Sequence, residues 1–122
     1  MVRKKNKLEL ENLLTELCNR IKDHYELDEI LLFGSYAKGT ANEWSDVDVA
    51  VISPSLNKRS VLGNVLDISN KIKFYDSDLQ LTAFPSQNFY QESFDPQSFI
   101  GEIKRTSKKI YNKKTGLDFS QL

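Results

Sequence analysis

The sequence predicts a single α/β-type domain in which helices pack on one small β-sheet. Segments with helical and strand patterns alternate along its 122 residues, in the order helix, strand, helix, strand, helix, strand, helix. This length is enough for one hydrophobic core but not for two, and no linker or internal repeat divides the chain. We therefore expect one domain over residues 1–122, with a core from about 8 to 112 and a loose tail over 113–122.

The first half of the chain supplies two helices and two strands. Leucine and isoleucine recur at helical spacing over residues 8–25, which predicts an amphipathic helix. Residues 29–33 form a short apolar run typical of a buried strand. The Gly34-Ser35 turn leads into a brief helix over residues 36–40, and the β-branched run 47–52 predicts the second strand.

The second half continues the alternation. Residues 60–74 again carry apolar side chains at helical spacing. From Asp78 to Phe84 polar and apolar residues alternate, which predicts a half-exposed strand. A short helix is expected over residues 88–94, and a last helix from Pro96 to about Tyr111, because proline is favoured in the first turn of a helix.

Composition excludes several classes of protein. The formal net charge is zero, so no overall field attracts nucleic acid, which we expect only as part of a partner's substrate. The basic residues near both chain ends are more often solvated surface than a binding site. The single cysteine, Cys18, fits a reducing compartment, and neither a membrane span of about 20 residues nor a signal peptide is visible. We therefore expect a cytoplasmic protein without membrane contact.

Two carboxylates begin the second predicted strand, at Asp46 and Asp48. Side chains at i and i+2 of a strand share a face, so these two repel each other unless a cation lies between them. Oxygen ligands of this kind suit Mg²⁺. The preceding Gly34-Ser35 turn suits a phosphate, since glycine allows close approach of the backbone and a helix start presents free N–H groups. Phosphate with Mg²⁺ indicates nucleotide chemistry; the alternative is that both aspartates only form a turn.

The motif Gly34-Ser35, ten residues, then Asp46-Val47-Asp48 resembles that of the DNA polymerase β-like nucleotidyltransferases. The short chain is most similar to the minimal nucleotidyltransferases, the MntA-like proteins encoded beside a HEPN-domain partner. The resemblance covers nearly the whole chain and implies the nucleotidyltransferase fold, an α+β fold with a small mixed β-sheet flanked by helices. Alternation alone favours a parallel sheet, but only about a dozen residues join the first two strands, near the lower limit for a parallel crossover. The resemblance implies an antiparallel first pair, and we expect it here.

The same resemblance implies a third carboxylate, and Asp78 matches its place. If the strand of Asp78 neighbours that of Asp46, three acids converge. Asp76 has the same parity along the strand and is the competing candidate, while either could simply be a polar strand start. We favour Asp78 as metal ligand and general base, on the register of the strand, where it shares a face with Gln80 and Thr82.

The expected roles follow from this assignment. Asp46, Asp48 and Asp78 are the candidate catalytic residues and metal ligands, for two Mg²⁺ ions about 3.5–4 Å apart, with Mn²⁺ as a substitute. Gly34 and Ser35 would cradle the β- and γ-phosphates of a nucleoside triphosphate.

Three further side chains flank the expected pocket. Lys38 could neutralise triphosphate charge. Many family members have arginine there, so the charge remains but the bidentate contact is lost; a solvated helix lysine is the alternative. Trp44 and Tyr36 could stack on a base, although aromatic residues near a sheet edge more often pack.

Together these features predict a Mg²⁺-dependent nucleotidyltransferase that transfers a nucleoside monophosphate to a hydroxyl and releases pyrophosphate. The transferred group that we expect first is AMP, with ATP as its donor. The chain has no second domain to bind an acceptor, so the resemblance implies a HEPN-domain partner. In toxin–antitoxin pairs the transferase AMPylates a tyrosine of that partner. Two alternatives stay open: a catalytically silent subunit that neutralises a partner sterically, and a small-molecule transferase whose acceptor pocket a partner subunit supplies.

Overall fold

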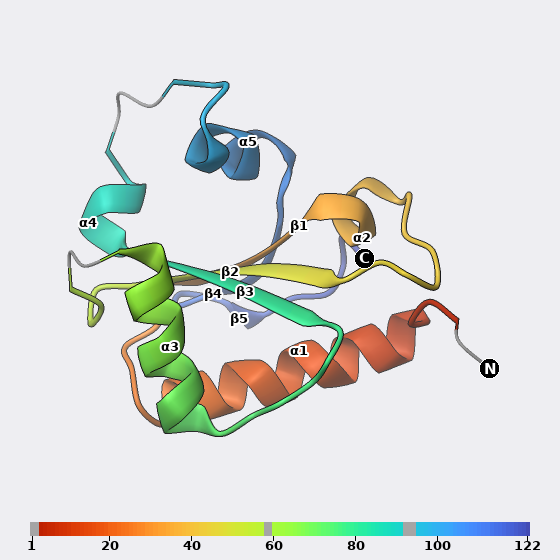
Figure 1. The fold of residues 1–122 in the computed structure, drawn as a ribbon, viewed down its shortest axis with the longest axis horizontal. Coiled ribbons are helices and arrows are strands. Elements are labelled where there is room, and N and C mark those ends of the chain that lie inside the picture. The colour runs from red at the N-terminus through yellow and green to blue at the C-terminus, as the bar shows by residue number, and fades with distance from the viewer. Residues whose placement is uncertain (1–2, 58–59, 92–94) are drawn as a thin grey trace.

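The computed structural model describes residues 3–57, 60–91 and 95–122. In these residues one mixed sheet has helices on both faces (Figure 1). Its strands are β1 (Glu29–Phe33), β2 (Val47–Ser53), β3 (Leu79–Pro85), β4 (Lys108–Asn112) and β5 (Gly116–Leu117). The helices are α1 (Lys7–Lys22), α2 (Gly34–Lys38), α3 (Val61–Ile72), α4 (Ser86–Phe89) and α5 (Phe99–Thr106). The prediction of a mixed sheet flanked by helices is confirmed.

The order of the strands places the two motif-bearing strands next to each other near the middle of the sheet. The order is β3-β2-β1-β4-β5, with β1 antiparallel to β2 and β2 parallel to β3. The antiparallel first pair that the family resemblance implies is therefore present. Strand β3 also lies beside β2, which was the condition set for the three acids to converge.

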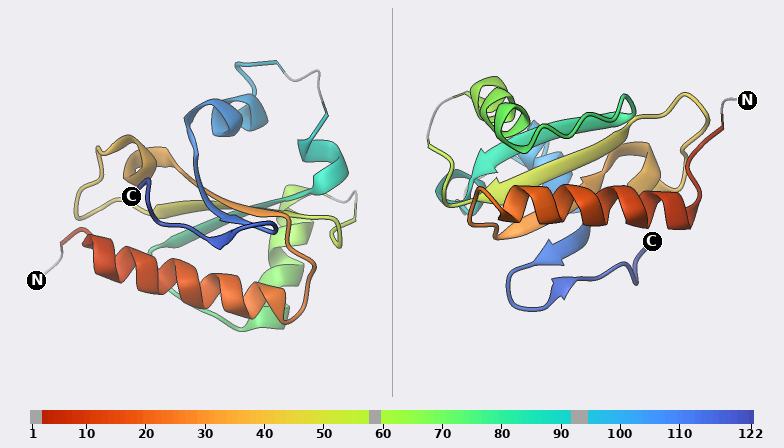
Figure 2. Two further views of the ribbon diagram at one scale, coloured as in Figure 1. Left: turned by 180° about the vertical axis from the view of Figure 1, so that it is seen from behind. Right: turned by 90° about the horizontal axis from the view of Figure 1, so that it is seen from below.

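The sheet separates two hydrophobic clusters, because side chains alternate between its faces. Helices α1 and α3 cover one face, where Leu14, Leu17 and Ile68 pack with Val47 and Val49 of β2. Figure 2 shows the same arrangement from behind and from below, with α4 and α5 on the other side of the sheet from α1.

The second cluster lies under α4 and α5. Ala50 and Ile52 of β2 pack there with Phe84 of β3, Phe89 of α4 and Ile103 of α5. Successive residues of β2 thus face different clusters, which fixes the register of the strand: a shift by one residue would exchange the buried faces.

Side-chain caps explain where the longer helices begin. At α1 the Glu9 N–H donates to the Asn6 side chain at 2.9 Å, and the Asn6 N–H donates to the Glu9 carboxylate at 3.1 Å. This reciprocal pair is a capping box. At α3 the Gly63 N–H donates to the Ser60 hydroxyl at 3.1 Å. Helix α3 lies within its predicted range, and α1 begins one residue before the predicted range of 8–25 and ends three residues before its end.

The prediction for the end of the chain is wrong. The last helix ends at Thr106 instead of Tyr111, and β4 follows it from Lys108. Strand β4 pairs with the edge of β1 and buries Ile110 and Tyr111, so sheet pairing overrides the helical pattern. The expected helix over residues 88–94 is instead the shorter α4, and residues 92–94 lie outside the described part.

The segment over residues 113–122 is ordered by the sheet instead of being a loose tail. Strand β5 pairs with β4 after a turn over residues 113–115, and its first residue, Gly116, has a φ of 78°. Phe119 and Leu122 pack against the first cluster, and the Asp118 N–H donates to the Ile110 carbonyl at 2.9 Å. In the part of the chain that the structure describes, no helix combines the length and the apolar character needed to cross a bilayer.

Candidate active site

The Gly34-Ser35 turn and the paired aspartates meet at one end of the sheet. Helix α2 begins at Gly34, directly after the last residue of β1. Because β1 and β2 are antiparallel, the end of β1 lies beside the start of β2, and Phe33 is the register partner of Asp48. Ten residues apart in sequence, the two parts of the motif are therefore neighbours in space.

Gly34 is required at this junction for two reasons. Its φ is 71°, in the left-handed region that L side chains rarely adopt. A Cβ atom built at this position would also overlap the Oδ2 atom of Asp48. The backbone of the turn thus lies directly against the carboxylate, which places a phosphate held by the turn close to a cation held by Asp48.

The two carboxylates have no compensating partner in the part of the chain that the structure describes. Asp46 is exposed and Asp48 is half-buried. Burial, and then the negative charge of Asp46, raise the pKa of the Asp48 carboxyl above its usual range. Within the described residues neither side chain has a hydrogen bond or an ion pair, so a divalent cation would relieve an unfavourable charge. Mg²⁺ is commonly held by one or two carboxylates together with substrate phosphates, and this donor set fits it.

The raised pKa leads to a stability prediction for Asp48→Asn in the absence of divalent ions. The folded state holds the Asp48 proton more tightly than the unfolded state, so ionisation of this carboxyl destabilises the fold. The penalty is absent below the usual aspartate pKa, grows as the pH rises toward the folded pKa, and is complete above it. We expect Asp48→Asn to have the higher melting temperature at neutral pH with EDTA, and the difference to vanish in acid.

Thermal melts of both proteins across this pH range measure the effect. Asp23→Asn, which removes an exposed acid at the opposite end of the sheet, is the matched control and should show no such pH-dependent difference. A destabilised Asp48→Asn at neutral pH would contradict the charge repulsion inferred for the pair.

The three acids that the sequence suggested do not gather at one point. Strand β3 begins at Leu79, so Asp78 precedes the strand. The Asp78 carbonyl accepts a hydrogen bond from the Val47 N–H at 2.7 Å, while its carboxylate lies 3.3 Å from the Lys5 ammonium. Asp76 lies 3.9 Å from the same Lys5 nitrogen. No three acidic, histidine or cysteine side chains form a potential metal cluster among the described residues.

Lys5 is thus a contact of the candidate acids that sequence reasoning missed. Its backbone N–H also donates to the Tyr36 hydroxyl at 2.9 Å, which ties the segment before α1 to α2. No local pattern in the sequence signals these contacts, because they join segments more than 30 residues apart. A role of Asp78 as ligand and general base stays a prediction.

The side chains expected to flank the pocket have different environments. The Lys38 ammonium lies 3.5 Å from the Glu102 carboxylate of α5, and both side chains are about half exposed. Such a surface pair is worth about 1 kcal/mol or less, so Lys38 can exchange it for a phosphate. Tyr36 packs against the first cluster. For Trp44 the expectation of packing is wrong, since it is 77% exposed on the loop before Asp46.

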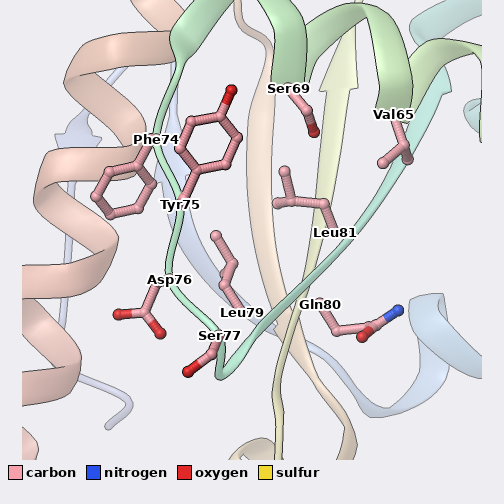
Figure 3. A pocket seen from close by; sticks show the side chains of 9 residues that line it. All are labelled: Val65, Ser69, Phe74, Tyr75, Asp76, Ser77, Leu79, Gln80 and Leu81. Carbon is pink, nitrogen blue, oxygen red and sulfur yellow. The ribbon is translucent and has the colours of Figure 1, made fainter.

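The largest described cavity lies elsewhere. It measures about 680 Å³ and is open, between α3 and β3 on the face opposite the second cluster. Figure 3 shows its walls, which include Phe74, Tyr75, Leu79 and Leu81. Neither the Gly34-Ser35 turn nor the paired aspartates line this cavity. The volume of a cavity therefore does not locate the site. The site is located by the junction at which the Gly34-Ser35 turn meets Asp46 and Asp48.

Comparison with known proteins gives relatives that match part of the chain. The chain is 48% identical over 54 residues to a protein of Methanocaldococcus jannaschii named "putative protein adenylyltransferase", a match that covers 43% of this chain and 37% of that protein. A second protein of that name and organism is 37% identical over 49 residues, covering 40% of this chain and 57% of the relative. The matches thus span between 37% and 57% of the length of these curated relatives.

Structural comparison extends the similarity to nearly the whole fold. A crystal structure described as a "putative nucleotidyltransferase" from Sulfolobus solfataricus superimposes with a TM-score of 0.67 at 16% sequence identity, covering 92% of this chain and 88% of that one. At this identity the likeness concerns the fold. The family model of the nucleotidyltransferase domain matches residues 10–114, which include both parts of the motif. On this match over most of its length, the chain belongs to the nucleotidyltransferase domain family.

Proposed function

We propose that this chain is a divalent-metal-dependent nucleotidyltransferase that transfers AMP from ATP to a hydroxyl of a partner protein. One observation carries the proposal: Asp46 and Asp48 have no ion-pair partner among the described residues, and the half-buried Asp48 lies directly against a glycine turn suited to a phosphate. Membership of the nucleotidyltransferase domain family supports the reaction type. The names of the relatives support AMP as the transferred group and a protein as the acceptor.

Each residue of the junction has a role in this proposal. Asp46 and Asp48 would hold Mg²⁺ or Mn²⁺, which when bound neutralises triphosphate charge and lowers the pKa of the attacking hydroxyl. The Gly34-Ser35 turn would bind the β- and γ-phosphates through its backbone and the Ser35 hydroxyl. Lys38 would add positive charge once it leaves Glu102.

The reaction balances as a single displacement at phosphorus. The acceptor oxygen forms a bond to the α-phosphorus, and the bond from that phosphorus to the oxygen bridging it to the β-phosphate breaks. Pyrophosphate leaves, and the hydroxyl proton passes to solvent or to a nearby base. The protein contributes mainly position and electrostatic complementarity, because the turn and the carboxylates are already held together before substrate arrives.

The proposed acceptor is a tyrosine of a HEPN-domain partner, in a toxin–antitoxin pair. Its support is the family resemblance together with the exposure of the junction, where Asp46 faces solvent. An acceptor that is itself a folded protein can present its hydroxyl to an open site of this kind, whereas a small molecule needs an enclosing pocket. Trp44, exposed beside Asp46, is available to such a partner.

Intact-mass spectrometry of the purified chain mixed with the HEPN-type protein encoded beside it tests this proposal. With ATP and Mg²⁺ we expect the partner to become heavier by one adenylyl group, and peptide mapping to place the group on tyrosine. The chain alone should transfer little to free small molecules. A partner that is bound and inhibited but keeps its mass would favour the steric subunit instead, and transfer to a small molecule only in the complex would favour the third alternative.

A further inference from the structure

We propose that Gln80, and not Asp78, occupies the third metal-facing position of this site, so that the site presents two carboxylates and one neutral amide. The inference rests on the proposed function, because it concerns the same cation. It predicts how this chain departs from a site with three acids. Four observations carry it: the register of β2 and β3, the faces on which their side chains lie, the contacts of Lys5 and the polar character of β3 beside Asp48.

The register places Gln80 directly beside Asp48. Strands β2 and β3 are parallel, and Asp48 is the register partner of Gln80, one step after Val47 and Leu79. Register partners on neighbouring strands are about 4.8 Å apart and point to the same face. The third strand therefore brings an amide, not an acid, to the level of the half-buried carboxylate.

The packing of the two strands fixes which face this is. The register pairs on one side are all buried in the cluster under α1 and α3 or packed against it: Val47 with Leu79, Val49 with Leu81, and Val51 with Ala83. The pair Ile52 and Phe84 lies in the opposite cluster. Asp48 and Gln80 have the parity of this second set, so both lie on the second face. Gln80 is exposed at the edge of the sheet and is also among the residues that line the cavity between α3 and β3, but Figure 3 shows its side chain on the other side of β3 from Leu79.

Asp78 and Asp76 have another partner. The Lys5 ammonium lies 3.3 Å from Asp78 and 3.9 Å from Asp76, and the Lys5 side chain is only 19% exposed. The Asp78 N–H also donates to the Asp76 carboxylate at 2.9 Å, which forms a turn before β3. These acids are thus charge-compensated by the segment that precedes α1, whereas Asp46 and Asp48 have no such partner among residues 3–57, 60–91 and 95–122.

Further along β3, a polar residue stands at a buried position, where packing alone would favour an apolar one. Thr82 follows Gln80 on the same face, is 6% exposed, and its hydroxyl oxygen has no hydrogen-bond partner among the described residues. Buried hydroxyls are normally satisfied by protein or by water. Together with Gln80, Thr82 makes this face of β3 polar from the level of Asp48 to the level of Ala50.

A neutral amide changes the chemistry of the third position. Its oxygen can ligate a cation or accept a hydrogen bond, as a carboxylate oxygen does. It adds no negative charge, so the site attracts a divalent ion less strongly than three acids would, and at neutral pH it cannot accept the proton of the attacking hydroxyl. Gln80 thus limits the intrinsic metal affinity and makes the site more dependent on the phosphates of the nucleotide.

Binding of Mn²⁺ alone, followed by electron paramagnetic resonance or calorimetry without nucleotide, tests the inference. We expect Gln80→Glu to bind Mn²⁺ at least about tenfold more tightly than the unmodified chain, since ligand charge sets affinity at oxygen sites. Gln87→Glu, which adds the same charge on α4, is the matched control and should not change the affinity. Asp78→Asn should also leave it unchanged, and Gln80→Ala, which adds no charge, should weaken it by about threefold.

The outcomes separate this inference from the proposed function. Weaker Mn²⁺ binding in Asp78→Asn with no gain in Gln80→Glu would overturn the inference and support Asp78 as the third ligand. Loss of Mn²⁺ binding in Asp46→Asn with Asp48→Asn, but no response to either change at Gln80, would overturn the inference alone. Unchanged Mn²⁺ binding in that double variant would count against the metal site itself and hence against the proposed function.

Discussion

Asparagine at both Asp46 and Asp48 should abolish nucleotidyl transfer and leave the fold intact. A metal that stabilises charge in the transition state is worth several kcal/mol, and each 1.4 kcal/mol is about tenfold in rate, so we expect a loss of about a thousandfold or more. The fold should survive because Asp46 is exposed, Asp48 is half-buried, and neither side chain has a partner within the described residues. Single-turnover transfer assays and thermal melts measure the two effects.

The matched control removes two charges at the opposite end of the sheet. Asp23 and Glu26 are exposed in the connection from α1 to β1, and β1 starts beside the end of β2, where Glu29 pairs with Ile52. Asp23→Asn with Glu26→Gln should keep full transfer activity. Equal activity of the Asp46 and Asp48 double variant and this control would show that the paired carboxylates are only a polar strand start.

Gly34→Ala should disable the site because the added methyl group displaces the carboxylate of a different residue, Asp48. The added methyl group would overlap Asp48 Oδ2, so either the turn or the carboxylate must shift. A misplacement of about 1 Å in an active site can cost roughly a hundredfold in rate, and we expect a loss of that order in transfer. The left-handed backbone at this position should also cost about 1–2 kcal/mol of stability.

Gly39→Ala separates the steric effect from the backbone effect. Gly39 has a φ of 76°, close to the 71° of Gly34, and a Cβ there would meet no described atom within 4 Å. Both variants should therefore lose a similar amount of stability in urea titrations, but only Gly34→Ala should lose transfer and Mn²⁺ binding. Full activity in Gly34→Ala would mean that the contact with Asp48 has no functional consequence.

The part of the fold that carries the motif could be predicted from local patterns. β1 and β2 are apolar runs bounded by a glycine turn and by two aspartates, and their predicted ranges agree closely with the structure. The pairing of β1 with β2 followed from the short connection and from the family resemblance. These features are local in sequence, so one chain suffices to recognise them.

What failed depends on contacts between distant segments. Residues 108–111 have a helical pattern with the preceding residues, yet they pair with β1 because that edge is otherwise open and Ile110 becomes buried there. The spacing of apolar residues alone could not distinguish a helix from a strand over residues 108–111. Trp44 was expected to pack, but the loop that carries it projects into solvent.

The third carboxylate shows the same limit within the site. Parity along the predicted strand could not distinguish Asp76 from Asp78, which both alternate with Leu79 and Leu81. The choice depends on the parallel register with β2 and on the position of Lys5, which lies more than 70 residues away in sequence. Neither can be inferred from the alternation of polar and apolar residues.

Transfer of isotope from ATP tests the central claim most directly. The purified chain and its HEPN-type neighbour are incubated with Mg²⁺ and with ATP labelled either at the α-phosphorus or at the γ-phosphorus. A nucleotidyltransferase places the α-label on the partner and releases the γ-label in pyrophosphate, and the Asp46→Asn with Asp48→Asn variant gives no label in either case. Labelling of the partner from the γ-position, or no labelling from the α-position by the unmodified chain, would contradict the function proposed for this site.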